Sequence, residues 1–509
     1  MQLIKDRKRL VTGFITVFVL LQPFIDVFTS LAIRNSMGAS LGVLVRSFFM
    51  AVITAYCILL SKTDKKLKLG VALYMIATGG YLMFYFAHFF KTGGLFFAFT
   101  NIKEAVKVFY FVFLLLGFYL IYKEYKFTVS DTVLSITAAL YMSIIVIAFV
   151  TGTSYPSYKH GEGFVGWFYS ANEIGAIIGI LAPYLLVNSV KGLIKALKEK
   201  KYPLFALYSF LCLETVFCAL FIGTKAVFLA FMLFVAIALA LALFKAYKKA
   251  KTVNISRKAV SSALIAAVLC VSVFSGLYIV SPIRANLTGK AVVEYTYLQK
   301  GTPFDPVGED PVELPGGFEP GEGNEQKDAE LYTVWDAEKE PLPVPVSVLN
   351  KVFNNRIVFS IPVSRHYMSS SWVEKLFGVG YVNRSDAVYD IEEAIEIDIV
   401  TIFLRHGVVG FVLYFVPAFT LAFWAISRIF SSKRDIKKRD CVLVSLFGIA
   451  VAFGMSVLAG HVLIAPAVSV YIAIAFIKLC ANAENAEEHD MTEIVDKSLS
   501  SCQKEPQTL

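Results

Sequence analysis

Charged residues are scarce in this chain. Lys, Arg, Asp and Glu make up 17% of its 509 residues, whereas 57% are hydrophobic and 14% are aromatic. Soluble domains carry about 25% charged and about 45–50% apolar residues. The composition therefore excludes an ordinary soluble globular domain and indicates an integral membrane protein.

Cysteine and histidine are also rare, with 7 and 6 copies. The cysteines fall in or beside apolar stretches or in the C-terminal tail, and no CxxC pair or His spacing typical of a metal site occurs. We therefore expect no disulfide framework, no metal and no cofactor. The net charge of +9 is explained by basic loops on one side of a membrane, so we expect no nucleic-acid partner.

What the chain has in abundance is apolar stretches close to the roughly 20 residues that cross a bilayer as a helix. Their number and spacing predict an all-α polytopic membrane protein with about twelve transmembrane helices. The stretches cover residues 10–31, 39–60, 69–90, 105–121, 130–150, 170–190, 203–222, 225–244, 259–280, 397–427, 441–458 and 461–479.

The distribution of Lys and Arg predicts the orientation. The first apolar run is long and has no small-residue cleavage site, so we interpret it as a retained helix and not as a signal peptide. With the N-terminus inside, the basic loops KTDKKLK, KGLIKALKEKK, KAYKKAKTVNISRK and SKRDIKKRD all face the cytoplasm. We expect a multi-pass protein of the cell (cytoplasmic) membrane with both termini cytoplasmic.

One connection is far longer than the others and is expected to be extracytoplasmic. Residues 1–280 hold helices one to nine, residues 281–396 form the loop, residues 397–480 hold helices ten to twelve, and 481–509 form a cytoplasmic tail. Within the loop, residues 301–345 are rich in Pro and acidic residues and predict a flexible insert. Residues 346–396 carry apolar residues at helical spacing and predict a helical, site-forming part.

Basic residues gather on the predicted outer side. They are Arg356, Arg365, Lys159 and Lys225. Guanidinium groups bind phosphate in a bidentate manner and a lysine adds a point charge, so this group favours an anionic ligand. The alternatives are a solvated arginine in a loop and a lysine that reaches the interface from a helix end.

Acidic residues occur where the chain re-enters the membrane, in EIDIVTIFLRHGVVGF. Glu396 and Asp398 come first, followed by Arg405 and His406. An ionisable residue at this depth is costly and indicates function, although pairing at the interface is an alternative. On one helix over residues 392–406, Glu396 and His406 share a side.

Other polar residues interrupt the apolar stretches. We interpret Asp26 and Arg46 as structural. Glu104 and Lys107 either pair inside the bundle or line a path for a polar headgroup.

Several segments together resemble the O-antigen ligase and O-antigen polymerase superfamily, over roughly residues 160–460. One segment, GFVGWFYSANEIGAIIGILAPYLL, is similar to the family segment in which an asparagine opens a helix; here that asparagine is Asn172. A second segment, GTKAVFLAF, is similar to the family's helix that starts with Thr-Arg or Ser-Arg, with Lys225 in place of the arginine. NNRIVFS resembles the arginine-containing loop helix, and LFGVGYVN the Gly-x-Gly turn after it. In the closing motif, Glu396 stands eleven residues before Gly407, where many ligases have histidine, and Arg405 stands where many have glutamate.

The resemblance implies a GT-C-type glycosyltransferase that acts on undecaprenyl-pyrophosphate-linked oligosaccharide in cell-surface polysaccharide biosynthesis. It implies pyrophosphate or glycan binding by Arg356, Lys225, Arg365, Lys159, Asn172, Arg405 and His406. Glu396, or else Asp398, would accept the proton of the acceptor hydroxyl. The departures favour a polymerase-like or Gram-positive-type member over a lipopolysaccharide ligase.

The alternatives are a flippase or transporter of the same lipid-linked substrate and a membrane sensor that uses the acidic loop. Charges concentrated on one side favour the enzyme over the flippase. Expected partners are the lipid-linked glycan, the bilayer and other membrane proteins of polysaccharide assembly.

Overall fold

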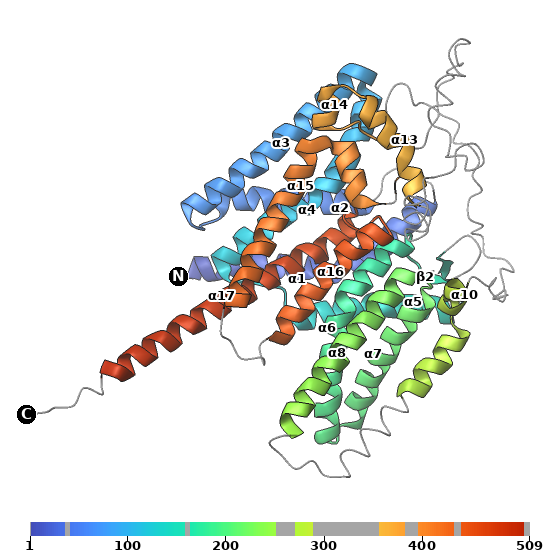
Figure 1. Ribbon diagram of the computed structural model, residues 1–509, viewed down its shortest axis with the longest axis vertical. Coiled ribbons are helices and arrows are strands. Elements are labelled where there is room, and N and C mark those ends of the chain that lie inside the picture. The colour runs from blue at the N-terminus through green and yellow to red at the C-terminus, as the bar shows by residue number, and fades with distance from the viewer. Residues whose placement is uncertain are drawn as a thin grey trace, which may run out of the picture. The chain divides into compact units, whose positions relative to one another are not determined.

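The computed structural model describes residues 2–35, 41–157, 163–250, 270–288, 356–381, 395, 397–431 and 439–502, and most of them are helical (Figure 1). Ten described helices are long and apolar enough to cross a membrane. Two shorter apolar helices, Cys270–Val280 and Val442–Leu458, coincide with the ninth and eleventh predicted spans. The protein is an all-α polytopic membrane protein, as the sequence predicts, while the count of twelve spans stays a prediction.

The chain divides into two compact units. The first comprises Met1–Thr12, Val45–Val129 and Gly321–Leu509, and the second comprises Gly13–Leu44 and Ser130–Pro320. Each unit is made of segments that are not consecutive in the sequence. The division therefore differs from the predicted one, which followed the order of the chain.

The first unit is built around α4 and α17. Its helices are α2 (Leu41–Ala55, which it shares with the second unit), the π-helical turn η1 (Tyr56–Leu60), α3 (Lys65–Gly93), α4 (Leu95–Tyr125), α13 (Arg356–Ser369), α14 (Trp372–Phe377), α15 (Asp398–Ser431), α16 (Arg439–Leu458) and α17 (Pro466–Cys502). α3, α15 and α17 pack on α4 or on one another. Aromatic side chains fill this core: Phe111 lies 5.4 Å from Tyr414 and 6.1 Å from Phe476, centroid to centroid.

α15 differs from the predicted helix in two ways. Ile395 and Ile397 are not helical, so a single helix over residues 392–406 is wrong at its start. The Thr401 hydroxyl donates to the carbonyls of Ile395 (3.2 Å) and Ile397 (3.1 Å), and Thr401 N donates to Ile397 O at 2.9 Å, so helical pairing begins at the Ile397 carbonyl. The helix is also broken inside, at Gly407, whose φ is 64° and ψ is −172°.

The second unit contains most of α1 (Gln2–Arg34), α5 (Asp131–Val150), α6 (Ala171–Lys198), α7 (Tyr202–Phe221), α8 (Lys225–Ala250), the Cys270–Val280 helix and α10 (Pro282–Thr288). Two short strands, β1 (Tyr155–Pro156) and β2 (Phe164–Gly166), form an antiparallel hairpin beside α5. The predicted structural role of Asp26 agrees with its contact, because the Tyr141 hydroxyl donates to its carboxylate at 2.6 Å.

The predicted long loop is described in part. Three helices, α10, α13 and α14, fall between residues 281 and 396. The predicted flexible insert, residues 301–345, lies outside the described residues.

Candidate functional site

In the first unit, the Gly-x-Gly turn packs directly on the broken helix of the closing motif. α14 begins with a capping box between Ser371 and Glu374 and ends at Gly378. The next two residues then bond to the end of the short helix that precedes Gly407: Val379 N donates to Leu404 O (3.1 Å) and Gly380 N to Arg405 O (3.2 Å). A helix end leaves carbonyls without partners, and here the turn supplies donors for two of them.

Glycine is required on both sides of this contact. A Cβ on Gly378 would lie 2.1 Å from the Arg405 carbonyl oxygen, and one on Gly407 would lie 2.5 Å from the Gly378 nitrogen. Both residues also have positive φ, 98° and 64°, which side chains rarely adopt. Gly378 of the Gly-x-Gly turn and Gly407 of the closing motif are therefore both needed for the same close contact between two backbone segments.

Arg405 and His406 point into this contact. Arg405 is 3% exposed, its Nη1 donates to Gly380 O at 2.7 Å, and its guanidinium lies 5.5 Å from the centre of the Tyr381 ring. His406 is fully buried, with Nδ1 3.2 Å from the Tyr81 hydroxyl and Nε2 3.1 Å from the Tyr381 hydroxyl. These contacts favour a positioning role for both residues. Their predicted contact with substrate stays a prediction.

Two α3 tyrosines and one α4 asparagine complete this cluster. The Tyr85 hydroxyl donates to Arg405 O at 3.0 Å, and the Tyr81 hydroxyl lies 3.1 Å from His406 O. Asn101 accepts a hydrogen bond from the Tyr381 backbone nitrogen. Sequence reasoning missed these residues, because tyrosines four apart in an apolar helix look like ordinary core positions.

Asp398 lies at the start of α15 and is fully buried. Its Oδ1 accepts from His461 N at 2.6 Å, and its Oδ2 accepts from Val462 N and Leu463 N, both at 2.7 Å. Three of the roughly four acceptor positions of the carboxylate are thus used by the backbone that joins α16 to α17. These contacts favour a structural role for Asp398.

α13 lies against the same region. Val363 and Tyr367 of this helix form an apolar cluster with Val379, Ile395 and Leu404. Arg356 is the first residue of α13, and Arg365 is exposed on it. The cluster therefore joins the helix that begins with Arg356 to Ile395, the residue before Glu396, while Glu396 itself lies outside the described residues.

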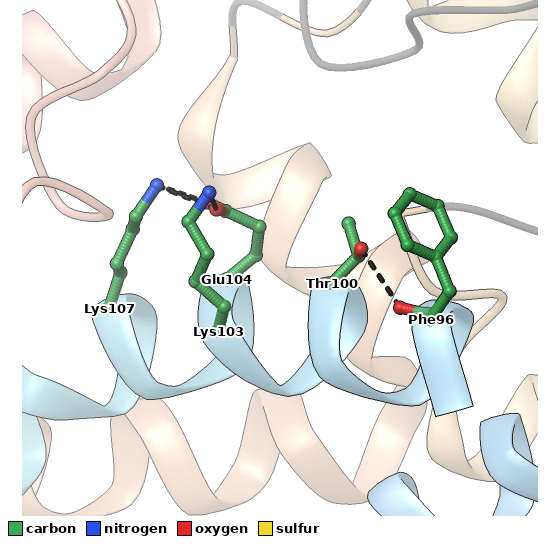
Figure 2. A network of polar contacts seen from close by, with 5 residues as sticks. All are labelled: Phe96, Thr100, Lys103, Glu104 and Lys107. Atoms are coloured by element: carbon green, nitrogen blue, oxygen red, sulfur yellow. Dashed lines mark hydrogen bonds and ion pairs between the residues drawn. The ribbon is translucent and has the colours of Figure 1, made fainter. Parts of the chain in front are cut away.

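Glu104 and Lys107 form an ion pair on α4, one of the two interpretations that the sequence left open (Figure 2). Lys107 Nζ lies 2.6 Å and 2.7 Å from the two carboxylate oxygens, and Lys103 Nζ lies 3.5 Å from one of them. Glu104 is 8% exposed, so the pair neutralises a carboxylate that would otherwise be costly to bury.

In the second unit, the structure brings together the segments that contain Asn172 and Lys225. Asn172 is the second residue of α6, after the N-cap Ser170. Before it, Ser157 Oγ donates to Ile222 O at 2.6 Å, and Gly163 approaches the same carbonyl so closely that a Cβ would lie 2.2 Å from it. The hairpin thus rests on the turn between α7 and α8. Lys225 opens α8 and is exposed, and Lys159 lies outside the described residues.

Asn286 of α10 joins the same turn, since its Nδ2 donates to Gly223 O at 2.7 Å. The buried Thr224 hydroxyl beside Lys225 has no hydrogen-bond partner among the described residues. A cation and an unpaired hydroxyl at the N-terminus of a long helix form an arrangement that favours an anion. No group of three or more His, Cys, Asp or Glu side chains arranged to hold a metal ion occurs in the described parts of the chain.

These features define a polytopic, all-α membrane protein. The motifs identified in its sequence form two packed groups, one in each unit. The family model described as O-antigen ligase like membrane protein matches residues 8–486. The chain belongs to this family, as the sequence motifs indicate, and is therefore a membrane enzyme of polysaccharide assembly. No curated protein and no solved structure matches the chain. The family match gives no support to a flippase.

Proposed function

We propose that this protein is a glycosyltransferase that polymerises or ligates undecaprenyl-pyrophosphate-linked oligosaccharide at the outer face of the cytoplasmic membrane. The observation that carries the proposal is the family match over residues 8–486. The basic loops support an orientation with both termini in the cytoplasm. The segment from 281 to 396, with α13 and α14, is then extracytoplasmic, and the fold is of the GT-C type.

In the proposed reaction, an acceptor hydroxyl attacks the anomeric carbon of the lipid-linked sugar. The new C–O bond forms as the bond from that carbon to the pyrophosphate oxygen breaks, and undecaprenyl pyrophosphate leaves with its negative charge. Glu396 accepts the proton of the acceptor hydroxyl. Arg356, with Arg365 as a second candidate, binds the pyrophosphate and stabilises its charge as it departs.

The geometry of the first unit supports these roles indirectly. Arg356 opens α13, and Ile395 is the neighbour of Glu396, and both segments are anchored to one apolar cluster through Val363 and Ile395. Asp398 is the weaker candidate for the proton acceptor, because three backbone N–H groups already occupy its carboxylate.

In the second unit, Lys225 is proposed to bind an anionic part of the lipid-linked substrate. Its exposure and its position at the start of α8 support this role. Asn172 and Lys159 are proposed to bind substrate on the strength of the motif resemblance.

The test is conversion of purified lipid-linked repeat by the full-length protein in nanodiscs. We expect the parent protein to release undecaprenyl pyrophosphate and form a longer or transferred glycan. Glu396→Gln keeps the shape of the side chain but not its basicity, so turnover should fall by about 10²–10⁴-fold, with much less change in donor binding. Glu396→His should recover part of the rate. A parent protein that binds the donor and never converts it would overturn the proposed function, and normal turnover by Glu396→Gln would place the base elsewhere.

A further inference from the structure

The β1–β2 hairpin of the second unit presents aromatic side chains on a well-anchored backbone. Gly166 N donates to Ser154 Oγ, and Trp167 Nε1 donates to Thr153 Oγ1, both at 2.9 Å. Phe168 is buried against Tyr141, with ring centroids 5.3 Å apart. The next residue, Tyr169, is 56% exposed. An exposed ring therefore follows directly on a fixed, buried one.

Arg34, the last residue of α1, lies against two of the tyrosines in this region. Its Cζ is 3.6 Å from the centre of the Tyr155 ring and 5.6 Å from that of Tyr169, and its Nε donates to Ser30 Oγ at 3.4 Å. Within the described ranges, no carboxylate lies within ion-pair distance of Arg34, and its two terminal nitrogens have no hydrogen-bond partner. The two tyrosine rings thus hold the guanidinium in place, while the described residues leave its terminal N–H groups available.

This combination has a specific chemical use. The face of an aromatic ring carries partial negative charge and attracts the C–H groups on the apolar side of a pyranose ring. A guanidinium fork donates to two oxygens at once, whether they are neighbouring hydroxyls or a carboxylate. Tyrosines that merely anchor a helix at the membrane interface would not require an arginine stacked between them with unused donors.

We infer that Arg34, Tyr155 and Tyr169 form a saccharide-binding subsite. A sugar residue of the glycan stacks on Tyr169, and its hydroxyl or carboxylate oxygens accept hydrogen bonds from Arg34, whose orientation Tyr155 fixes. The inference rests on the proposed function for the identity of the ligand, since a glycan polymerase or ligase must hold sugars beyond the reacting one. None of the three residues is proposed to accept the proton or to bind the pyrophosphate. The subsite should therefore bind the glycan and not take part in bond breaking.

The experiment uses the full-length protein in nanodiscs of zwitterionic lipid. The probe is the free oligosaccharide released by mild acid from the producing cell's own lipid-linked glycan, without lipid or phosphate, and its Kd is measured by calorimetric titration. Tyr169→Ala removes a contact worth about 0.5–1.5 kcal/mol, so we expect binding to weaken about 2- to 10-fold. Tyr169→Trp should retain the affinity. Arg34→Lys keeps the charge but loses the fork, and we expect a loss of similar size.

Two control variants match these changes in chemistry. Tyr202 is 68% exposed at the start of α7, and Arg284 is an exposed arginine of α10. Tyr202→Ala and Arg284→Lys should leave the oligosaccharide affinity within about twofold, since neither residue belongs to the subsite. Equal affinity in the parent, Tyr169→Ala and Arg34→Lys would overturn the inference.

Two further measurements distinguish sugar binding from lipid binding and the subsite from the transfer reaction. If Arg34 binds a lipid phosphate instead, Arg34→Lys will reduce the binding of phosphatidylglycerol vesicles and leave oligosaccharide binding unchanged, which also overturns the inference. In the turnover assay, the subsite variants should raise KM for the lipid-linked repeat with little change in kcat. Oligosaccharide binding that depends on Tyr169, in a protein without turnover, would support the subsite and refute the proposed transferase. Turnover with an unchanged KM in Tyr169→Ala would support the proposed transferase and refute the subsite.

Discussion

The contacts of Asp398 lead to a measurement that separates a structural carboxylate from a catalytic one. Asparagine has the same shape but only one acceptor oxygen. In its best orientation, Asp398→Asn keeps the bonds from Val462 N and Leu463 N, now without charge, and turns an NH₂ group toward His461 N. One charge-assisted hydrogen bond is worth about 1.5–3 kcal/mol and a neutral one about 1 kcal/mol. The loss of one and the weakening of two amount to about 2.5–7 kcal/mol.

The expected result is a fall of several degrees in the unfolding temperature of the purified protein in detergent. Below that temperature, conversion of lipid-linked repeat should stay within about tenfold of the parent. The matched control is Asp64→Asn. The Asp64 carboxylate also accepts two backbone N–H groups, both at 3.0 Å, but at the exposed N-cap of α3. Asparagine is an equally good N-cap, so the change in stability should be below about 0.5 kcal/mol.

The opposite outcome would refute the structural role of Asp398. If Asp398→Asn unfolds at the parent's temperature and loses turnover by about 10² or more, Asp398 is the proton acceptor, and Glu396 is not. If both stability and turnover are unchanged, the three N–H contacts contribute nothing that the neutral side chain cannot supply.

Three other predictions concern the loop and its packing. Arg356→Lys should retain part of the turnover and Arg356→Ala far less, because lysine keeps the charge without the planar fork; equal, near-normal turnover in both would refute pyrophosphate binding there. Replacement of residues 305–340 by a short Gly/Ser linker should leave product formation largely intact, and complete loss in a correctly inserted protein would contradict the assignment of this segment as accessory. Gly407→Ala should destabilise the protein by more than about 2 kcal/mol, because residue 407 has a positive φ and a Cβ there would lie 2.5 Å from Gly378 N. The control is Gly454→Ala, which has open space around it and should be neutral or stabilising in thermal unfolding.

Much of the fold could be predicted from the sequence because the bilayer imposes a simple rule on apolar length. Ten of the twelve predicted stretches correspond to helices long enough to cross a membrane, and Asn172 and Lys225 lie at helix starts as the motifs indicate. The two-stranded hairpin was not predicted, because strands of two and three residues have no periodicity to detect. The break at Gly407 was also missed, since residues 397–427 were interpreted as one apolar stretch despite Arg405 and His406.

The candidate site could be predicted only as a set of residue types. Sequence reasoning identified Asp398, Arg405 and His406 as unusual, but it could not show that their partners are backbone groups and tyrosine hydroxyls. Those partners come from α3, from the Gly378–Tyr381 turn and from residues 461–463, which are distant in sequence. Spacing within one helix carries no information about such contacts.

The contacts of the closing motif suggest why charged residues are placed where the chain enters the membrane. A helix that begins at Asp398 and breaks at Gly407 leaves backbone donors and acceptors without helical partners, and unsatisfied backbone groups are costly in a bilayer. Arg405 Nη1 binds the Gly380 carbonyl, and Asp398 binds three N–H groups of the neighbouring connection. In this part of the protein the buried charges satisfy irregular backbone, and that irregular backbone lets the Gly-x-Gly turn and α13 pack on α15. The contacts of Asp398 and Arg405 therefore favour structural roles for these two residues, and the proposal of Glu396 as proton acceptor and Arg356 as pyrophosphate ligand rests on the motif resemblance.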